Sequence, residues 1–590
     1  MAGRSAADDR AVMCSWAGTF TPFGTQIGPA VDSADRLARM LTYVADSGGL
    51  RTDGTLAQVW IVGAEALELL GWRVDEGDAD DDTPMDVLRT ECRDRITEAV
   101  ARDQTALERG GWRLREGWET GGAWVRLERI DVNEKRGRAR NASKGKPTSK
   151  FRVDVILEPY AWTTPSPSGE ENLGILGDDA AGWGLVEIPD DVTDEQMREL
   201  EDAARAELGR RLCAAVEQLG VLPALTATRT GAAIAGKIWR QGTRRNAEIE
   251  ANDFDVARSH VLSGPVPVPP LTYPPRGELE PAAVWSVEAI DPAELAESDR
   301  LVIVDQFGSF LGSFSVELPI GQPDVLSMAD LDKALWFSDL PPEKWPVGLW
   351  AIMGPPLHEL PDFGLLPPPH PEWGHQARLN PEINPVFTVT TETLKALAQT
   401  WTSGYGLQWC IENIALVEGW VWPASAPALA KFQTQVGEGY KHFVATGDRA
   451  MRKFTNKVYQ GYQGALANSP EQWGQFRAQN SNPVAQANIH AHARWRIRRQ
   501  DANAHARTGR RAAMVRTDAL TFLVPPGMDV ATFADPMPKK GPALGQLMVE
   551  RWCVLTDESR EALAAARGQE RVAAAIAAAF ANSPHVEVCK

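Results

Sequence analysis

The chain has 590 residues, which is enough for two to four domains with substantial cores. Its 61 basic residues are outnumbered by 79 acidic ones, and the net charge of −18 excludes a surface that coats nucleic acid everywhere, though not a local basic channel. The six cysteines form no Cys-x-x-Cys pair, so they predict neither a disulfide framework nor a zinc site, which fits a reducing cytoplasm. No signal peptide or apolar run of membrane-spanning length is visible, so we expect a cytoplasmic protein with no membrane partner.

Residues 1–110 predict a mixed α/β structure, and a hairpin and a long helix follow them. A short apolar strand at 59–63 runs into a helix at 64–70. Alternating residues over 111–131 predict a β-hairpin, and the acidic amphipathic run 194–220 predicts a long helix with a solvated face.

A basic run lies between these two features. Eight basic residues occur from 135 to 152 without a single acid, and the Gly, Ser, Asn and Pro residues among them are typical of a loop. The loop is either a solvated surface segment or a contact for nucleic-acid phosphates. Its basic residues are Lys135, Arg136, Arg138, Arg140, Lys144, Lys146, Lys150 and Arg152.

Two later segments each present an aspartate at the end of an apolar strand. The aliphatic run before Asp305 is one, and the other is a hairpin that carries Asp518 at its tip. We predict that residues 301–325 and 511–524 lie in one antiparallel sheet. The two carboxylates could then share a divalent cation.

The remaining segments predict a linker and helices. Prolines and charges between 241 and 300 indicate an extended linker, and helices follow across 427–467 and 484–507. In the last helix His490 and His492 are two residues apart, so they lie on different faces and do not predict a metal site. The arginines of the same helix are either a phosphate-facing surface or a solvated face, and they include Arg494, Arg496, Arg498 and Arg499.

Five motifs between 301 and about 553 resemble those of family B DNA polymerases, in order. Val302 to Phe310 is similar to the first palm motif Asp-x-x-Ser-Leu-Tyr, and Arg452 to Tyr459 is similar to the fingers motif Lys-x-x-x-Asn-Ser-x-Tyr-Gly. Two further matches are Arg516-Thr517-Asp518-Ala519 with the Asp-Thr-Asp-Ser hairpin and Pro538-Lys539-Lys540 with the segment after it. The fifth is 387–397 together with the apolar, strand-like run 411–422, which resemble the strand–helix–strand insertion of the protein-primed branch. The chain also resembles divergent polymerase-like proteins of linear actinobacterial plasmids and phages.

The resemblance implies roles for single residues. Asp305 and Asp518 stand at the positions that hold two catalytic Mg²⁺ ions, and Phe310 stands where an aromatic ring packs on the incoming sugar. Arg452 and Lys453 stand at the triphosphate. The implied nucleotide-binding set also includes Asn456 and Tyr459. The candidate nucleic-acid contacts come from the basic charge described above and not from the resemblance, and they are Lys135, Arg136, Arg138, Arg140, Lys144, Lys146, Arg498 and Arg499.

The resemblance implies an α/β (α+β) fold with a palm (an antiparallel sheet with helices) and fingers after an exonuclease-like (RNase H-like) α/β lobe. The implied domains are that lobe at 1–240, the linker at 241–300, the first half of the palm with its insertion at 301–425, the fingers and following helix at 426–507, the second half of the palm at 508–553 and a short helical thumb remnant at 554–590. No Asp-x-Glu occurs in the chain, and the family's exonucleases use that tripeptide, so we expect an inactive lobe.

The implied function is template-directed DNA synthesis by two-metal nucleotidyl transfer, in the replication of a linear phage or plasmid genome. Its partners would be DNA, deoxynucleoside triphosphates and, in the protein-primed case, a terminal protein. The alternative is a non-catalytic polymerase-like protein that binds DNA in replication or at telomeres. Three departures from the family pattern keep this alternative open: Arg516 in place of the first hairpin Asp, Gly308 in place of Ser, and the displacement of the fingers Gly to Gly461.

Overall fold

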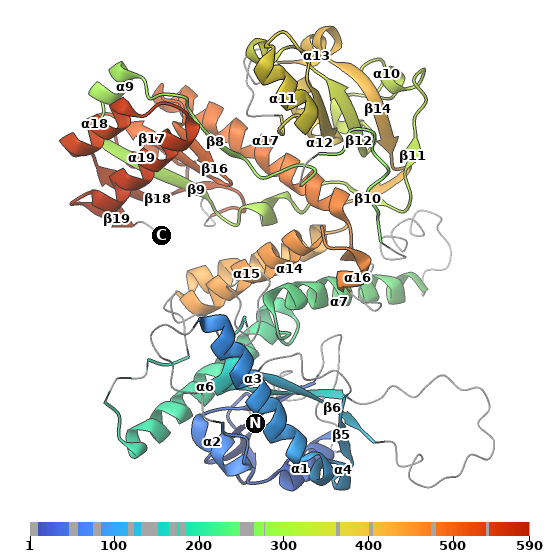
Figure 1. Ribbon diagram of the computed structural model, residues 1–590, viewed down its shortest axis with the longest axis vertical. Coiled ribbons are helices and arrows are strands. Elements are labelled where there is room, and N and C mark those ends of the chain that lie inside the picture. The colour runs from blue at the N-terminus through green and yellow to red at the C-terminus, as the bar shows by residue number, and fades with distance from the viewer. Residues whose placement is uncertain are drawn as a thin grey trace. The chain divides into compact units, whose positions relative to one another are not determined.

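The computed structural model shows a mixed α/β protein that divides into two compact units (Figure 1). Unit 1 comprises Met1–Ile238 and Glu438–Tyr462, and unit 2 comprises Trp239–Gly437 and Gln463–Lys590. The predicted α/β class is confirmed. The structure describes residues 10–46, 57–74, 84–115, 123–130, 152–163, 174–176, 185–187, 189, 191–247, 265–275, 278–360, 366–399, 405–473, 480–538 and 542–588.

Unit 1 is built on a seven-stranded sheet with the strand order β3-β2-β1-β4-β7-β6-β5. The strands β1, β4 and β7 run parallel to one another, and the other neighbouring pairs are antiparallel. The predicted hairpin is confirmed as the pair β5–β6. The strands are β1 (Ala11–Ser15), β2 (Gly18–Phe20), β3 (Gln26–Gly28), β4 (Ala57–Ile61), β5 (Trp112–Leu114), β6 (Trp124–Arg129) and β7 (Arg152–Leu157).

The longest helix of unit 1 has a capping signal at each end. The long helix α6 starts after Thr193, whose side chain and that of Gln196 form a reciprocal capping box, and it ends at Gly220 with a φ of 77°. The predicted helix over 194–220 is thereby confirmed. The helices are α1 (Ala34–Asp46), α2 (Ala64–Leu70), α3 (Met85–Arg102), α4 (Gln104–Arg109), α6 (Asp194–Leu219) and the first part of α7 (Ala227–Ala247).

A later segment completes unit 1. Residues Glu438–Tyr462 come from the helices α14 (Ala430–Ala445) and α15 (Arg449–Ala465). Gly231 of α7 lies so close to this segment that a Cβ atom there would come within 2.5 Å of the Cβ atom of Tyr462. Arg210 of α6 forms an ion pair with Asp448 of the same segment. The sequence around 438–462 therefore packs with a part of the chain more than two hundred residues earlier.

Unit 2 contains a six-stranded antiparallel sheet with the order β19-β18-β9-β17-β16-β8, here called the palm sheet. The predicted pairing of the two aspartate-bearing segments is confirmed, because β17 and β9 are antiparallel neighbours. The strands are β8 (Val284–Ser286), β9 (Arg300–Gln306), β16 (Met514–Arg516), β17 (Ala519–Val524), β18 (Leu547–Val554) and β19 (Val586–Val588).

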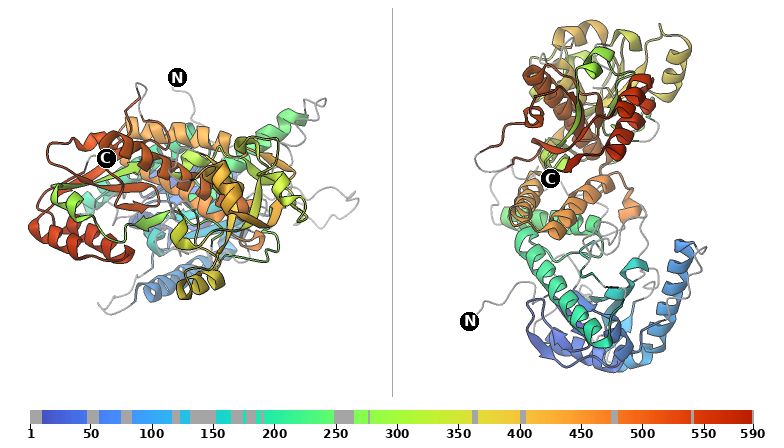
Figure 2. Two further views of the ribbon diagram at one scale, coloured as in Figure 1. Left: turned by 90° about the horizontal axis from the view of Figure 1, so that it is seen from above. Right: turned by 90° about the vertical axis from the view of Figure 1, so that its left-hand side faces the viewer.

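Both faces of the palm sheet are buried, which explains the continuous aliphatic run in β9. Val302 and Val304 pack with α17 (Pro483–Thr508). Leu301 and Ile303 pack on the other face with α18 (Asp557–Ala565) and α19 (Gln569–Asn582). Figures 1 and 2 show these helices on opposite sides of the strands. Successive side chains along β9 therefore point to opposite faces of the sheet, and so to different helices.

A four-stranded sheet forms a second core of unit 2, and two sequence predictions are partly wrong near it. Residues after 306 leave the palm sheet, because Gly308 turns the chain with a φ of 62° into the 3₁₀ turn η5 (Phe310–Ser313). The strand predicted at 411–422 is confirmed from Ala415 to Val421, but the residues before it form a helix, because Leu407, Cys410 and Ile411 face this core at helical spacing. The elements are β10 (Leu318–Ile320), β11 (Asp324–Val325), α10 (Leu331–Ala334), β12 (Gly348–Met353), α11 (Pro371–Leu379), β13 (Val386–Thr390), α12 (Thr391–Ala398), α13 (Leu407–Asn413), β14 (Ala415–Val421) and β15 (Ala424–Ala426).

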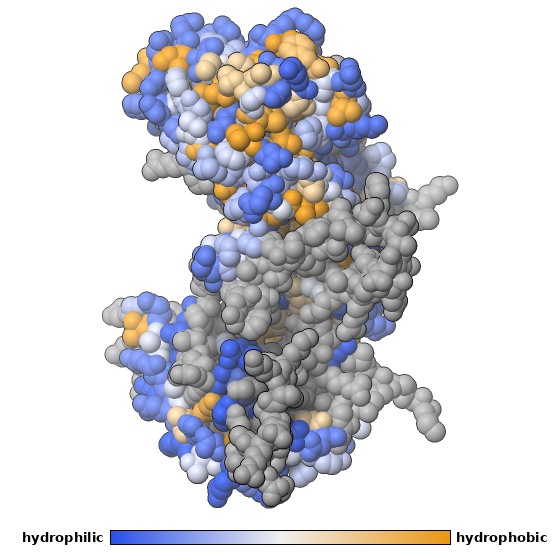
Figure 3. Space-filling view, turned by 90° about the vertical axis from the view of Figure 1, so that its right-hand side faces the viewer, coloured by the Kyte–Doolittle hydropathy of each residue, from blue (hydrophilic) through white to orange (hydrophobic). Residues whose placement is uncertain are grey.

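The surface of unit 2 carries scattered apolar side chains (Figure 3). The exposed large ones around β11 and α10 are Val325, Met328, Phe337 and Leu340. In the part of the chain that the structure describes, no helix has the length and apolar character needed to cross a membrane.

Candidate active site

Two acidic residues lie side by side at one end of the palm sheet. Asp305, the sixth residue of β9, is the register partner of Ala519 on β17. Asp518 precedes Ala519, and its carbonyl oxygen accepts a hydrogen bond from the backbone N–H of Gln306 at 3.1 Å. Both aspartates are partly exposed. Segments more than two hundred residues apart thus bring two carboxyl-bearing residues to neighbouring backbone positions.

The hairpin that carries Asp518 has a strained tip. Thr517 is the one non-glycine residue in the described part of the chain with a positive φ, which is 59°. This conformation costs a residue other than glycine about 1–2 kcal/mol. The backbone N–H of Thr517 donates to the carbonyl oxygen of Ala283 at 2.5 Å, and that bond anchors the tip to the chain just before β8. The strained tip fixes the backbone from which Asp518 projects.

One row of side chains crosses the palm sheet at the level of Asp305. The register places Val284, Arg516, Ala519, Asp305 and Met548 opposite one another on β8, β16, β17, β9 and β18. Residues in such a row share a face, so Arg516 lies two strands, or about 10 Å, from Asp305. Arg516 is exposed, and within the described residues it forms no ion pair with either aspartate. It adds positive charge beside the carboxylates without neutralising them by direct contact.

Arg496 of α17 lies under the end of β9. Its guanidinium Nη2 donates to Oε1 of Gln306 and to the carbonyl oxygen of Ser309, each at 2.8 Å. Burial and the charge of Arg499 lower the pKa of Arg496 to about 10, and the charge of Asp518 acts in the opposite direction. The side chain therefore stays protonated at neutral pH. It is a buried cation that holds the turn between Asp305 and Phe310.

Two glycines make room for this guanidinium. A Cβ atom on Gly545 would come within 2.3 Å of Cζ of Arg496, and one on Gly312 within 2.4 Å of its Nη1. The backbone N–H of Gly545 also donates to the carbonyl oxygen of Phe307 at 2.5 Å. The loop before β18 and the turn after β9 are thus joined around one arginine side chain.

We expect Gly545→Ala to lower the free energy of unfolding by about 2–4 kcal/mol, because the new methyl group would meet Arg496 and the residue has a φ of 77°. Gly527→Ala is the matched control, since Gly527 has a φ of 78° but nothing within 4 Å of an added Cβ atom. It should lose only the backbone part, about 1 kcal/mol. Urea unfolding of both variants measures the difference. Equal losses would show that Arg496 does not need the space at Gly545.

Phe310 begins η5 and packs against a histidine of α17. The rings of Phe310 and His490 lie 5.1 Å apart between centroids at an interplanar angle of 36°. Nδ1 of His490 lies 2.7 Å from the carbonyl oxygen of Glu280, so Nδ1 carries the proton, and burial lowers the pKa of this imidazole. His492 instead contacts Oγ of Ser313 at 3.1 Å, and burial lowers its pKa to about 3. The two histidines therefore have separate packing partners.

The predicted fingers residues lie on α15 in unit 1. Asn456 and Tyr459 share one face of the helix, as their spacing predicts, and the Tyr459 hydroxyl donates to Oδ1 of Asn456. Tyr459 is buried, whereas Arg452 and Lys453 are partly exposed. Because the two carboxylates belong to unit 2, a joint nucleotide site of all these residues stays a prediction.

The predicted nucleic-acid contacts have different outcomes. Lys135, Arg136, Arg138, Arg140, Lys144 and Lys146 lie outside the described residues. The expected arginine surface on α17 is wrong for Arg494, Arg496 and Arg498, which are buried because this helix runs through the core of unit 2. Arg498 packs over the ring of Trp285 at 5.0 Å, and of these four arginines only Arg499 is exposed, over Trp495 at 4.7 Å. A DNA contact on this helix stays a prediction for Arg499.

Asp305 and Asp518 suit Mg²⁺ better than a metal whose ligands must all come from protein side chains. Among the described residues, no group of three or more His, Cys, Asp or Glu side chains could hold a metal ion. Mg²⁺ keeps several waters and is commonly bound by one or two carboxylates together with substrate phosphates. Asp305 and Asp518 supply that number of carboxylates at adjacent positions.

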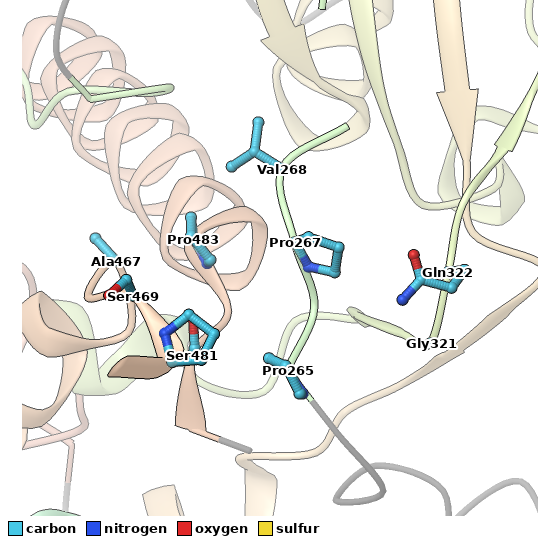
Figure 4. Close-up of a pocket in the computed structure, with 10 residues that line it drawn as sticks. Pro265, Pro267, Val268, Gly321, Gln322, Ala467, Ser469, Ser481 and Pro483 are labelled. Carbon is cyan, nitrogen blue, oxygen red and sulfur yellow. The ribbon is translucent and has the colours of Figure 1, made fainter. Parts of the chain in front are cut away.

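A cavity of about 640 Å³ elsewhere in unit 2 lacks such chemistry (Figure 4). It lies between the chain at Pro265–Val268, the turn at Gly321 and Gln322, and the residues that precede α17. None of the described residues that line it is titratable, and prolines form much of its wall. The paired carboxylates therefore remain the candidate active site.

No protein-family model and no curated protein matches the chain. Among solved structures it is similar to Phi29 DNA polymerase complexed with primer-template DNA and incoming nucleotides, with 11% identity and a TM-score of 0.42, over 92% of this chain and 85% of that one. It is also similar to the post-translocation binary complex of the same enzyme, with 12% identity and a TM-score of 0.41, over 92% and 84% of the two chains.

Proposed function

We propose that this protein is a template-directed DNA polymerase. The observation that carries the proposal is the register of the palm sheet, which sets Asp305 opposite Ala519 and so beside Asp518 at one sheet end. Nucleotidyl transfer needs carboxylates that hold divalent cations against the reacting phosphate. The motif order in the sequence supports the same reaction, with DNA and deoxynucleoside triphosphates as partners and either a terminal protein or a nucleic-acid strand as primer.

In the proposed site, Asp305 and Asp518 would hold Mg²⁺, which when bound neutralises charge on the transferred phosphoryl group. Arg496 keeps the turn from Gln306 to Ser309 in place, so that Phe310 can pack on the sugar of the incoming nucleotide. Arg452 and Lys453 would pair with the triphosphate. Asn456 and Tyr459 would cover the nascent base pair.

The N-terminal lobe is proposed to lack exonuclease activity. Its strand β1 carries no acidic residue. Asp154 of β7 is buried and bound by Nε and Nη2 of Arg126 at 2.6 and 3.0 Å, so its carboxylate is already engaged. Proofreading by a metal-dependent site in this lobe would need carboxylates that β1 does not supply.

One observation favours the alternative of a non-catalytic DNA-binding protein. Arg516 occupies the row of Asp305 at the position where the resembling polymerases have an acid. A cation about 10 Å from Asp305, and two residues from Asp518 in the same hairpin, weakens the hold of the carboxylates on Mg²⁺. The same charge can instead bind a phosphate of the primer strand or nucleotide.

Primer extension by the full chain tests the proposal. The expected result is extension of a primed DNA template that follows the template sequence, requires Mg²⁺ or Mn²⁺ and stops when EDTA is added. If the protein binds the primed template but extends it with neither Mg²⁺ nor Mn²⁺, the polymerase proposal is wrong and the non-catalytic DNA-binding function takes its place.

Phe310→Ala is expected to admit ribonucleotides, because removal of the ring opens space for a 2′-hydroxyl. The discrimination between deoxy- and ribonucleotide, measured as the ratio of kcat/KM, should fall by about 10–100-fold. Phe337→Ala is the control, since Phe337 is an exposed phenylalanine of the same unit. If the Phe310→Ala variant is active and its discrimination is unchanged, Phe310 does not contact the sugar.

A further inference from the structure

One face of unit 1 carries an ordered array of arginines on β5, β6 and β7. The register places Arg113, Glu128 and Arg152 in one row across the three strands. In the next row on the same face, Arg126 is the partner of Asp154, and the backbone N–H of Arg115 donates to the carbonyl oxygen of Arg126 at 3.0 Å. Side chains two residues apart on a strand share a face, so both rows belong to one surface, here called the arginine face.

Two buried carboxylates organise this array. Glu128 has 8% of its side chain exposed and lies 2.9 Å from Nε of Arg152, 3.7 Å from Nε of Arg115 and 3.9 Å from Nη2 of Arg113. Burial raises the pKa of the second carboxylate, that of Asp154, while its hydrogen bonds to Arg126 and the charges of several arginines oppose the rise. The acids hold the guanidinium groups in place and do not balance them.

The described residues of the arginine face carry surplus positive charge. Arg229 of α7 is exposed and close enough to lower the pKa of Asp154 through its charge, and it adds a fifth arginine to the two acids. About a third of each side chain is exposed at Arg113, Arg115 and Arg152. The chain as a whole has a net charge of −18. This surface is locally basic on a protein that otherwise repels polyanions.

An aromatic ring lies in the same array. Trp124 precedes Arg126 by two residues on β6, and the Arg126 guanidinium lies 5.0 Å above its ring. Bases of single-stranded nucleic acid stack on such rings and on guanidinium planes, and phosphates pair with arginines. None of the exposed large apolar side chains in the described part of the chain belongs to β5, β6 or β7, which disfavours a lipid surface.

We propose that the arginine face binds single-stranded nucleic acid, with phosphates on Arg113, Arg115, Arg152 and Arg229 and a base stacked on Trp124. This site belongs to unit 1, whereas the carboxylates belong to unit 2, and its binding needs neither metal nor nucleotide. A chain that binds single strands but never extends a primer would leave this inference standing and remove only the polymerase proposal.

The test is fluorescence anisotropy of a labelled single-stranded DNA with the full chain between 50 and 200 mM salt. The double variant Arg113→Ser/Arg115→Ser leaves Glu128 paired with Arg152. Loss of two phosphate contacts should reduce the slope of log K against log salt by about 1.4. Trp124→Leu should weaken binding about 5- to 100-fold with the slope unchanged.

Arg36→Ser/Arg39→Ser on α1 is the matched control, because it removes two exposed arginines of the same unit. It should leave the slope as in the wild type. Circular dichroism checks that each variant is folded. If Arg113→Ser/Arg115→Ser does not fold, the single variant Arg115→Gln takes its place, and it should reduce the slope by about 0.7. No binding by the wild type, equal slopes in the test and control variants, or equal affinity for duplex and single strand would overturn the proposal.

Discussion

Asp518→Asn is expected to lower primer extension by about 10³-fold while the protein stays folded. The amide keeps the size of the carboxylate but removes the charge that would hold a divalent cation. Loss of metal-based stabilisation of the transition state costs several kcal/mol, and about 4 kcal/mol corresponds to this factor. The measurement is kcat for correct nucleotide addition at saturating Mg²⁺, with the midpoint of thermal unfolding as the folding check.

Two comparisons decide the meaning of that result. Asp305→Asn should give a loss of the same size, because both carboxylates serve one site. Asp324→Asn should change nothing, since Asp324 is an exposed acid on β11 in the same unit. If Asp518→Asn extends primers as fast as Asp324→Asn does, the hairpin acid has no part in catalysis.

Glu280→Gln is expected to destabilise unit 2 by about 3–5 kcal/mol. Glu280 is fully buried, and its Oε1 accepts hydrogen bonds from the backbone N–H of Thr390 and from the hydroxyl of Thr393, both at 2.8 Å. Its other oxygen forms an ion pair with Arg494, whose side chain is 4% exposed. The amide would leave the arginine as a buried charge without its counterion.

Urea unfolding of three further variants separates charge from packing. Glu278→Gln should be nearly neutral, because Glu278 is about half exposed. The double variant Glu280→Leu/Arg494→Met removes both charges and should lose less stability than Glu280→Gln, since no charge is left buried alone. If Glu280→Leu/Arg494→Met is less stable than Glu280→Gln, the loss of stability comes from the hydrogen bonds of the two threonines and not from the unpaired charge.

Strands and helices whose capping residues and apolar pattern lie within their own segment could be predicted from the sequence. The helix α6 has a capping box at one end and a glycine at the other, and both signals lie within it. The strand β9 is aliphatic on both faces because helices pack on both sides of it, and the turn at Thr517 and Asp518 separates two apolar runs. The pairing of the aspartate segments followed from these local patterns together with the motif order.

The environment of the candidate site could not be predicted, because it depends on distant partners. Arg496 looks like a solvated residue of a basic helix, yet its partners Gln306 and Gly545 lie 190 and 49 residues away in the sequence. Glu280 falls in the linker predicted at 241–300, yet its side chain forms hydrogen bonds with β13 and α12 and an ion pair with α17. The glycines at 312 and 545 are the local features that leave space for this guanidinium.

The return of residues Glu438–Tyr462 to the first unit bears on how the protein can fold during synthesis. The ribosome completes Ile238 long before it makes Tyr462, and at 5–20 residues per second the delay is roughly 10–45 s. Until then the nascent lobe lacks the helical segment that covers Gly231 of α7 and pairs with Arg210 of α6. Its apolar surface is open to chaperones and to misassembly for that interval, and a fragment that ends at residue 238 would remain in this incomplete state.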